Sequence, residues 1–239
     1  MSTVSSSMTF DQLQRYRLGG EMIDAVRDRK VFRILDAGSR EGFLRSYLPE
    51  DRIVNLDRGI FSGDGFLRGD ALSLPFPDQA FDVAVNIDVL EHLSPPDRPG
   101  LLSEMDRVSR RAFIVGAPFQ SDEVTQAEDL AAAFSLRIQG RENEFLREHR
   151  REGIPQLQEV LEWGATRGYR TAVVPNGYLP RWLMMISLNE YLGRLSDPWA
   201  MIFAANRLYH EQFYRADNAA PAYRQMILFG KEGVFDPAE

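Results

Sequence analysis

Cysteine is absent from this sequence, and histidine occurs only three times, as His92, His149 and His210. The absence of cysteine excludes disulfides, thiol nucleophiles and thiolate metal sites, and it fits a reducing cytoplasm. Because the three histidines lie far apart in the sequence, a zinc or iron centre would depend on carboxylates. We therefore expect no metal site and a cytoplasmic location.

Positive charge is also in deficit. The chain has 28 Lys and Arg against 35 Asp and Glu, a net charge of −7, with an isoelectric point near 5.2. This balance argues against nucleic acid as a partner, since binding phosphate backbones needs a clustered basic face. No apolar run is long enough for a membrane span, and residues 1–7 lack the basic and apolar regions of a signal peptide. The sequence predicts no membrane insertion.

The most informative segment is a predicted strand–helix–strand unit. Apolar residues over 31–36 and 52–57 predict two strands, and the segment 41–48 between them has the pattern of a helix. The turn after the first strand carries Gly38 and Gly42. Glycine lets the backbone turn sharply and approach a ligand closely, as in the crevice of nucleotide-binding sheets. This unit predicts a site for a nucleoside-containing cofactor.

Three acidic residues, Asp36, Asp57 and Asp70, end successive strand-like segments. In a parallel sheet these ends open onto one crevice, and a carboxylate after the second strand can accept both hydroxyls of a ribose. Three carboxylates do not suit a pyrophosphate, but they suit hydroxyls, an adenine amino group and positive charge. S-adenosylmethionine has these features. An NAD site would favour a tighter glycine motif, whereas position 40 is Arg.

The rest of the chain continues the alternation of strands and helices. The pattern predicts an α/β fold: a Rossmann-like, mostly parallel seven-stranded sheet with helices on both faces, an N-terminal helix and an inserted helical cap. The remaining expected elements are a helix over 10–28 capped by Thr9 or Asp11, a loop over 58–69, strands over 80–87 and 112–116, a helix over 94–109, a polar segment over 117–153 with a helical part at 123–134, a helix over 154–167, a strand over 169–174, helices over 179–195 and 199–214, and an antiparallel last strand over 223–231 at the sheet edge.

The length of 239 residues suits one large α/β domain with insertions, or one domain with a small cap. The predicted parts of this single domain, residues 1–239, are an N-terminal tail and helix (1–30), a cofactor-binding core (31–118), the remainder of the core with an insertion (119–174), a helical cap (175–221), and a last strand and tail (222–239).

Four segments within residues 31–118 together resemble the class I S-adenosylmethionine-dependent methyltransferases. They are Leu-Asp-Ala-Gly-Ser-Arg-Glu-Gly at 35–42, Asn-Leu-Asp at 55–57, Gly-Asp-Ala-Leu-Ser-Leu-Pro-Phe at 69–76, and the run from Phe81 to Leu93. The resemblance implies a methyltransferase with S-adenosyl-L-methionine as cofactor. It also implies cofactor-binding roles for Asp36 and Gly38 at the methionyl part, Asp57 at the ribose, Asp70 and Ala71 at the adenine, and the backbone of Asn86 near the methionine amino group. Gly42 and Arg58 are further expected cofactor-binding residues.

The second half carries a looser resemblance. Segments 144–155, 168–170 and 176–182 look like bacterial methyltransferases associated with glycosyltransferases and surface-polysaccharide assembly. This resemblance implies an acceptor oxygen on a small molecule or glycan. The alternative from another class is a non-catalytic S-adenosylmethionine-binding partner or regulatory module. A third alternative is an enzyme that uses a phosphate-bearing nucleotide. The protein could form an oligomer under any of these three functions.

Two histidines are the candidate catalytic residues. A hydroxyl acceptor needs a base, which would be His92 after the fourth strand, or His149 if its loop folds back over the crevice. An acceptor carboxylate would need none. The ordinary alternatives are a partly buried histidine at position 92, and a helix cap formed by Glu148 and His149.

Aromatic and methionine side chains concentrate between residues 175 and 220. Such residues at helical spacing are more often core than a ligand site. We expect a cap whose inner face is core and whose edge overhangs the crevice, with Trp182 contacting the acceptor if it faces the pocket.

Overall fold

A computed structural model of the protein describes residues 8–59, 63, 65–231 and 233–234. Its centre is a seven-stranded sheet in the order β3-β2-β1-β4-β5-β7-β6. The strands β1 to β6 run in one direction, whereas β7 is antiparallel to both of its neighbours. The sheet is therefore mixed, with a mostly parallel body. The strands are β1 (Arg33–Ala37), β2 (Arg52–Asp57), β3 (Phe66–Arg68), β4 (Phe81–Ile87), β5 (Ser109–Pro118), β6 (Arg170–Tyr178) and β7 (Ala222–Gly230).

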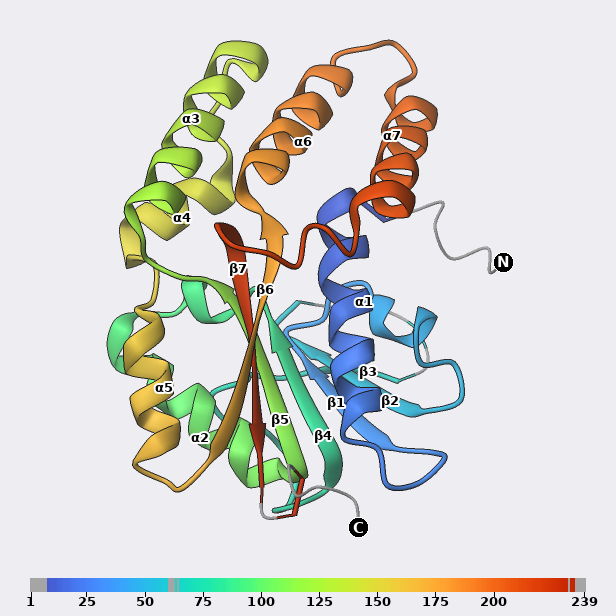
Figure 1. Ribbon diagram of the computed structural model, residues 1–239, viewed down its shortest axis with the longest axis vertical. Helices are drawn as coiled ribbons and strands as arrows, with labels where there is room; N and C mark the ends of the chain where they lie inside the picture. Colours follow the sequence, from blue (N-terminus) through green and yellow to red (C-terminus); the bar gives the residue numbers. More distant parts are fainter. Residues whose placement is uncertain (1–7, 60–62, 64, 232, 235–239) are drawn as a thin grey trace.

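Helices cover both faces of this sheet and rise above one end of it (Figure 1). One face packs against α2 and α5, and the other against α1 and η2. The helices are α1 (Phe10–Ala25), α2 (Arg98–Val108), α3 (Asp122–Gln139), α4 (Glu144–Glu152), α5 (Leu157–Ala165), α6 (Leu179–Leu192) and α7 (Pro198–Phe213), with 3₁₀ turns η2 (Phe43–Ser46), η3 (Leu90–His92) and η4 (Pro95–Asp97). None of the helices in the described ranges has the length and apolar composition that a membrane crossing requires.

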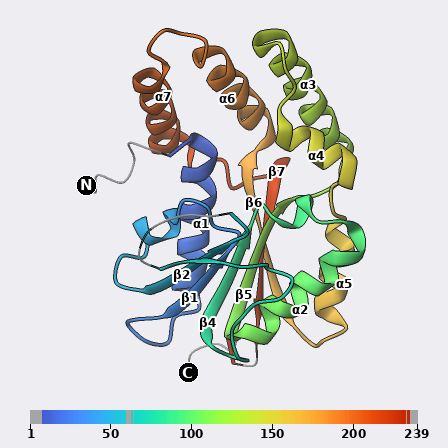
Figure 2. The same cartoon turned by 180° about the vertical axis from the view of Figure 1, so that it is seen from behind.

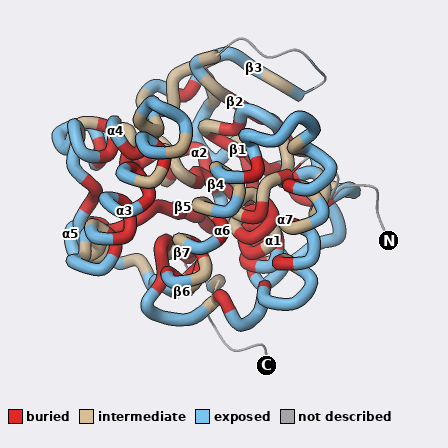
Figure 3. Tube along the Cα trace, turned by 90° about the horizontal axis from the view of Figure 1, so that it is seen from above, coloured by how far each residue is buried: buried red, intermediate tan, exposed pale blue. Residues whose placement is uncertain are grey.

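The buried residues concentrate in the strands and on the helix sides that face them (Figure 3). All seven residues of β4 are buried, as its apolar sequence predicts for a strand covered on both faces. Asp82 is the charged exception. Its carboxylate lies at the amino end of β4, where it accepts from the Arg33 amide at 2.8 Å and from Arg110 at 2.7 Å. This carboxylate is structural, as predicted, and far from the carboxyl ends of the strands.

The cap is built from four helices, α3, α4, α6 and α7 (Figures 1 and 2). Since α3 follows β5 and α6 follows β6, the cap lies at the carboxyl ends of the parallel strands. It is larger than the predicted segment 175–221, because α3 packs against α6. The predicted pocket-facing position of Trp182 is wrong. Its side chain is 3% exposed, and its ring stacks on Tyr223 with centroids 3.7 Å apart.

Four other expectations are corrected. The helix expected over 41–48 is only the turn η2, because Gly42 adopts a left-handed φ of 67° and the chain must reach β2 at Arg52. The predicted loop over 58–69 contains the short strand β3, and the polar segment 117–153 contains α4. The first helix ends at Ala25, although its expected cap is present as a capping box between Thr9 and Gln12.

The last strand is antiparallel as predicted, but it does not lie at the edge. β7 inserts between β5 and β6. Burial explains this placement: eight of the nine residues of β7 are buried, whereas most of β6 is exposed or half-buried. A strand so apolar is stable only where sheet neighbours and helices cover it.

Candidate functional site

The turn between β1 and η2 places the backbone against the end of β4. The Gly38 amide donates to the Leu56 carbonyl at 2.6 Å. Gly38 has a φ of +90°, and a Cβ there would lie 2.2 Å from Cγ2 of Val89. Both the conformation and the lack of space require glycine. The predicted cofactor turn is therefore present as a close approach of three backbone segments.

Asp36 is buried beneath this turn. One of its oxygens, Oδ2, has no hydrogen-bond partner. Burial raises the pKa of Asp36 to about 7, and the Ser39 hydroxyl and the Arg15 charge offset only part of that effect. Asp36 is not a helix N-cap, since Gly42 occupies that position before η2. A buried acid without a complete set of partners favours a cationic ligand nearby.

Asn86 and Asn55 bring further polar atoms to the same edge. The buried Nδ2 of Asn86 donates to the Ala37 carbonyl at 2.8 Å. Asn55, which pairs in register with Asp36, is buried with neither side-chain atom hydrogen-bonded. No role was predicted for Asn55 from the sequence. The feature that could have identified it is a polar side chain inside an otherwise apolar strand.

The other predicted cofactor residues follow β2 and β3. Asp57 ends β2 and accepts from the Gly59 amide at 2.7 Å. Asp70 accepts from the Leu72 amide at 2.9 Å and from Nη2 of Arg58 at 2.9 Å. Partial burial opposes ionisation of Asp70, but these donors outweigh it and lower its pKa. Thus Asp36, Asp57 and Asp70 follow three neighbouring strands, and Arg58 and the half-buried Ala71 lie beside Asp70.

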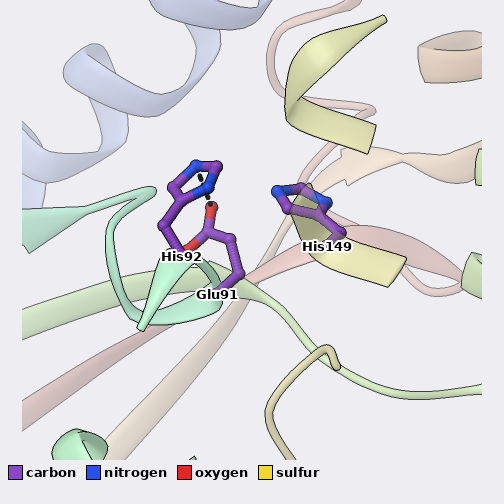
Figure 4. Close-up of side chains that lie close together, drawn as sticks. All are labelled: Glu91, His92 and His149. Atoms are coloured by element: carbon purple, nitrogen blue, oxygen red, sulfur yellow. Dashed lines mark ion pairs between the residues drawn. The ribbon is translucent and has the colours of Figure 1, made fainter. Parts of the chain in front are cut away.

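The two candidate catalytic histidines lie together although 57 positions separate them in the sequence. The rings of His92, on η3, and His149, on α4, have centroids 5.0 Å apart. Glu91 completes the cluster, with one ligand atom from each residue lying within 4.8 Å of the others (Figure 4). Burial, followed by the electrostatic effect of the neighbouring His149, lowers the pKa of His92. Burial and the adjacent Asp88 raise the pKa of Glu91 well above its usual range.

The ordinary alternative for His92 agrees with its position, since it is a partly buried residue at the end of η3, and its ring also lies beside a second histidine. The alternative for His149 is wrong. His149 does not cap the helix that follows Gly153: it lies within α4, and its Nδ1 is 2.8 Å from Oε1 of Glu128 on α3. Two of the three histidines therefore lie side by side in the fold, although they are far apart in the sequence. The third, His210 on α7, lies near Arg17.

Asp88 and Arg224 are further residues that sequence reasoning missed. Asp88 follows β4 with a left-handed φ of 55°. Its carboxylate accepts from Arg15 and from Arg224, which donates from Nη2 at 2.6 Å. Asp11 joins the group 3.1 Å from Arg224. These charges hold the pKa of Asp88 down to about 2, against the effect of its burial. The network ties α1, β4 and β7 together beside the crevice.

The sheet order and the turn at Gly38 give the domain a Rossmann-like fold, and comparisons with known proteins point to methyltransferases. Residues 35–112 match the family model described as a methyltransferase domain. An uncharacterized methyltransferase of Mycobacterium sp. (strain JLS) is 26% identical over 176 residues, covering 62% of this chain and 66% of the relative. The chain thus matches slightly less than two thirds of the length of that relative.

Solved structures share the fold at low identity. A putative methyltransferase from an antibiotic biosynthesis pathway of Anabaena variabilis superposes with a TM-score of 0.56 at 12% identity, covering 94% of this chain and 99% of that one. Magnesium protoporphyrin IX methyltransferase of Synechocystis, solved with bound SAH (S-adenosylhomocysteine), gives a TM-score of 0.53 at 11% identity, covering 92% and 83%. These similarities establish the architecture.

Proposed function

We propose that this protein acts as a single methyltransferase domain that transfers a methyl group from S-adenosylmethionine to an oxygen of a small molecule or glycan. The observation that carries the proposal is the edge formed by Asp36, Asp57 and Asp70 beside the Gly38 turn, within the segment that matches the methyltransferase family. This edge offers acceptors for hydroxyl and amino groups and a buried acid for a positive charge.

Each cofactor residue has a specific task in this proposal. Asp57 accepts the ribose hydroxyls, and Asp70 and Ala71, with Arg58 beside them, frame the adenine. Asp36, Gly38, Gly42 and Asn86 surround the methionyl part. The sulfonium supplies an activated methyl group, so the protein contributes mainly alignment and exclusion of water.

The acceptor side is assigned to His92 and His149. Both lie beyond the carboxyl end of β4, where η3 and α4 meet. A hydroxyl must lose a proton when it is methylated, and a neutral imidazole suits that step. The lowered pKa of His92, caused first by burial and then by His149, leaves the ring neutral at pH 7. This pairing of a cofactor edge with nearby histidines favours an oxygen acceptor.

The cofactor part is tested by calorimetry with S-adenosylhomocysteine. Asp57→Ala should weaken binding roughly tenfold or more, because a charged acceptor taking two hydrogen bonds contributes about 1.5–3 kcal/mol. The control is Glu50→Ala, an exposed carboxylate paired with Lys30 just before the amino end of β2, which should bind like the wild type. Equal affinities for both variants would remove Asp57 from the site.

The transfer itself is tested by a screen of nucleotide-sugars, glycan fragments and small acids with labelled S-adenosylmethionine. We expect thermal stabilisation by S-adenosylhomocysteine but not by NAD, and methylation of a hydroxyl acceptor that falls roughly 10²-fold in His92→Ala. Stabilisation by NAD would favour a different nucleotide enzyme. Cofactor binding without transfer to any acceptor would instead favour the non-catalytic binding module.

A further inference from the structure

Glu91, His92 and His149 converge on one point between η3 and α4 (Figure 4). Two of the converging side chains are almost completely buried: Glu91 is 1% exposed and His149 is 4% exposed. Oε2 of Glu91 and Nε2 of His149 have no hydrogen-bond partner. Buried polar atoms are nearly always paired, and leaving them unpaired is costly. A carboxylate oxygen and an imidazole nitrogen that both lack partners indicate a ligand that accepts electron pairs.

A second set of contacts fixes the orientation of His149. Its Nδ1 lies 2.8 Å from Oε1 of Glu128, and the same oxygen accepts from the Tyr223 hydroxyl at 2.9 Å. Because an ionised carboxylate only accepts hydrogen bonds, Nδ1 of His149 carries the proton and Nε2 carries the free lone pair. A carboxylate behind a histidine in this way is the usual arrangement in metal sites.

His92 is held less firmly than His149. Its Nδ1 lies 3.0 Å from Oε2 of Glu148, but this contact does not have the geometry of a hydrogen bond. Its Nε2 lies 4.0 Å from Oε1 of Glu91. Both imidazoles therefore bring a nitrogen atom close to the Glu91 carboxylate, and His149 is oriented from behind by Glu128.

We propose that Glu91, His92 and His149 bind a divalent transition-metal cation of the zinc type. Two imidazoles with one carboxylate favour such an ion over magnesium, which prefers oxygen ligands. Two ligands about 2.1 Å from one ion stand at most roughly 4.2 Å apart, so the side chains close slightly around it. Asp88 is not a ligand, because Arg15 and Arg224 occupy its oxygens.

Three protein ligands leave a coordination position open, and its use rests on the function proposed above. The acceptor hydroxyl oxygen binds there, and the cation lowers the pKa of that hydroxyl. The hydroxyl proton leaves to water. The oxygen then forms its bond to the methyl carbon as the carbon–sulfur bond breaks, and the bonding pair stays on sulfur. The products are a methyl ether and neutral S-adenosylhomocysteine, so the two histidines act through the metal rather than as free bases.

The test is titration of chelator-treated full-length protein with Zn²⁺ alone, followed by calorimetry, and with Co²⁺ alone, followed by absorption. We expect one equivalent of Zn²⁺ per chain and the visible absorption of Co²⁺ bound to nitrogen ligands. His149→Gln and Glu91→Gln should weaken Zn²⁺ binding 10²-fold or more, and Glu128→Gln roughly 10- to 100-fold. His210→Gln is the matched control, a half-buried histidine elsewhere in the chain, and should bind as the wild type does.

Absence of stoichiometric binding by the wild type would overturn the proposal, as would equal affinities of His149→Gln and His210→Gln. Circular dichroism on each variant checks the fold, and Glu128→Gln tests the site without removing a ligand. Calorimetry with S-adenosylhomocysteine on the same samples separates the two proposals. Loss of metal binding with intact cofactor binding overturns only the metal site, whereas metal binding without cofactor binding overturns only the methyl transfer.

Discussion

The side-chain amide of Asn86 donates to the main-chain carbonyl of Ala37 at 2.8 Å, joining the end of β4 to the residue that precedes the Gly38 turn. The bond is buried, so water does not readily replace it. It helps to fix the position of the Gly38 turn, next to which the methionyl part of the cofactor is expected to bind. The positions of two neighbouring strand ends therefore depend on one side chain.

Asn86→Ala should lower the free energy of unfolding by about 1–3 kcal/mol, because the Ala37 carbonyl would stay buried without its donor. Urea denaturation measures this loss. Ser103→Ala is the control, since its hydroxyl also donates at 2.8 Å but lies on the exposed surface of α2, and its effect should be near zero. An equally small effect of Asn86→Ala would show that the Asn86–Ala37 bond does not hold the turn.

Asp36 should make stability depend on pH in an unusual direction. Burial raises its pKa in the folded protein to about 7 from 3.8, so the folded state binds the proton more tightly. The resulting stability is present below about pH 4 and is lost as pH rises through 7. When the pH rises from 5 to 8, the free energy of unfolding of the wild type should fall by about 2–3 kcal/mol relative to that of Asp36→Asn. Urea unfolding of both proteins at both pH values measures this difference. A constant difference would mean that Asp36 titrates normally.

Gly38→Ala should cost more stability than Gly140→Ala. Both glycines have left-handed φ angles, but a Cβ at Gly140 meets nothing within 4 Å, whereas one at Gly38 overlaps Val89. Gly140→Ala should cost about 1 kcal/mol from backbone strain alone, and Gly38→Ala about 1–3 kcal/mol more from overpacking. The double variant Gly38→Ala/Val89→Ala should lose less than the sum of its single changes. Equal costs at the two glycines would contradict the overlap.

Trp182→Ala should destabilise the whole domain rather than alter acceptor binding. Its ring is stacked on Tyr223 in the core of the cap, and such a truncation costs about 3–5 kcal/mol. Trp199 is the comparison, because it is 61% exposed and its truncation should change stability by less than about 0.5 kcal/mol. Thermal unfolding of both variants checks the contrast. A wild-type melting temperature for Trp182→Ala would place its ring outside the core.

The cofactor half of the fold was readable from sequence because its signals are local. Apolar strands, a glycine turn and an acid at the end of each strand lie within a short stretch of chain, and the structure has these features in the predicted order. The length of the helix after Gly42 was not readable. It depends on two left-handed glycines and on how soon the chain must enter β2, which is a matter of tertiary geometry.

The histidine cluster could not be predicted in the same way. His92 and His149 meet only because α4 folds back against η3, and α4 is a short, highly charged helix whose sequence resembles a polar loop. The burial of Glu91 is equally non-local, since a carboxylate after a strand is ordinarily solvated. The prediction that β7 lies at the sheet edge was wrong. The order of strands depends on which strand is covered more completely by its neighbours and by helices, and this coverage is set by contacts between distant parts of the chain.

The position of β7 affects how this domain is made. Ribosomes extend a chain from its amino end, so β5 and β6 both emerge before the segment that pairs with them. Until residues 222–230 are synthesised, the apolar β5 exposes an unpaired edge, and β6 has no place in the sheet. The nascent chain therefore carries a partly open sheet while residues 119–221 are synthesised, and such edges favour aggregation. Because of this strand order, we expect β5 to need protection during synthesis, either by chaperones or by rapid elongation.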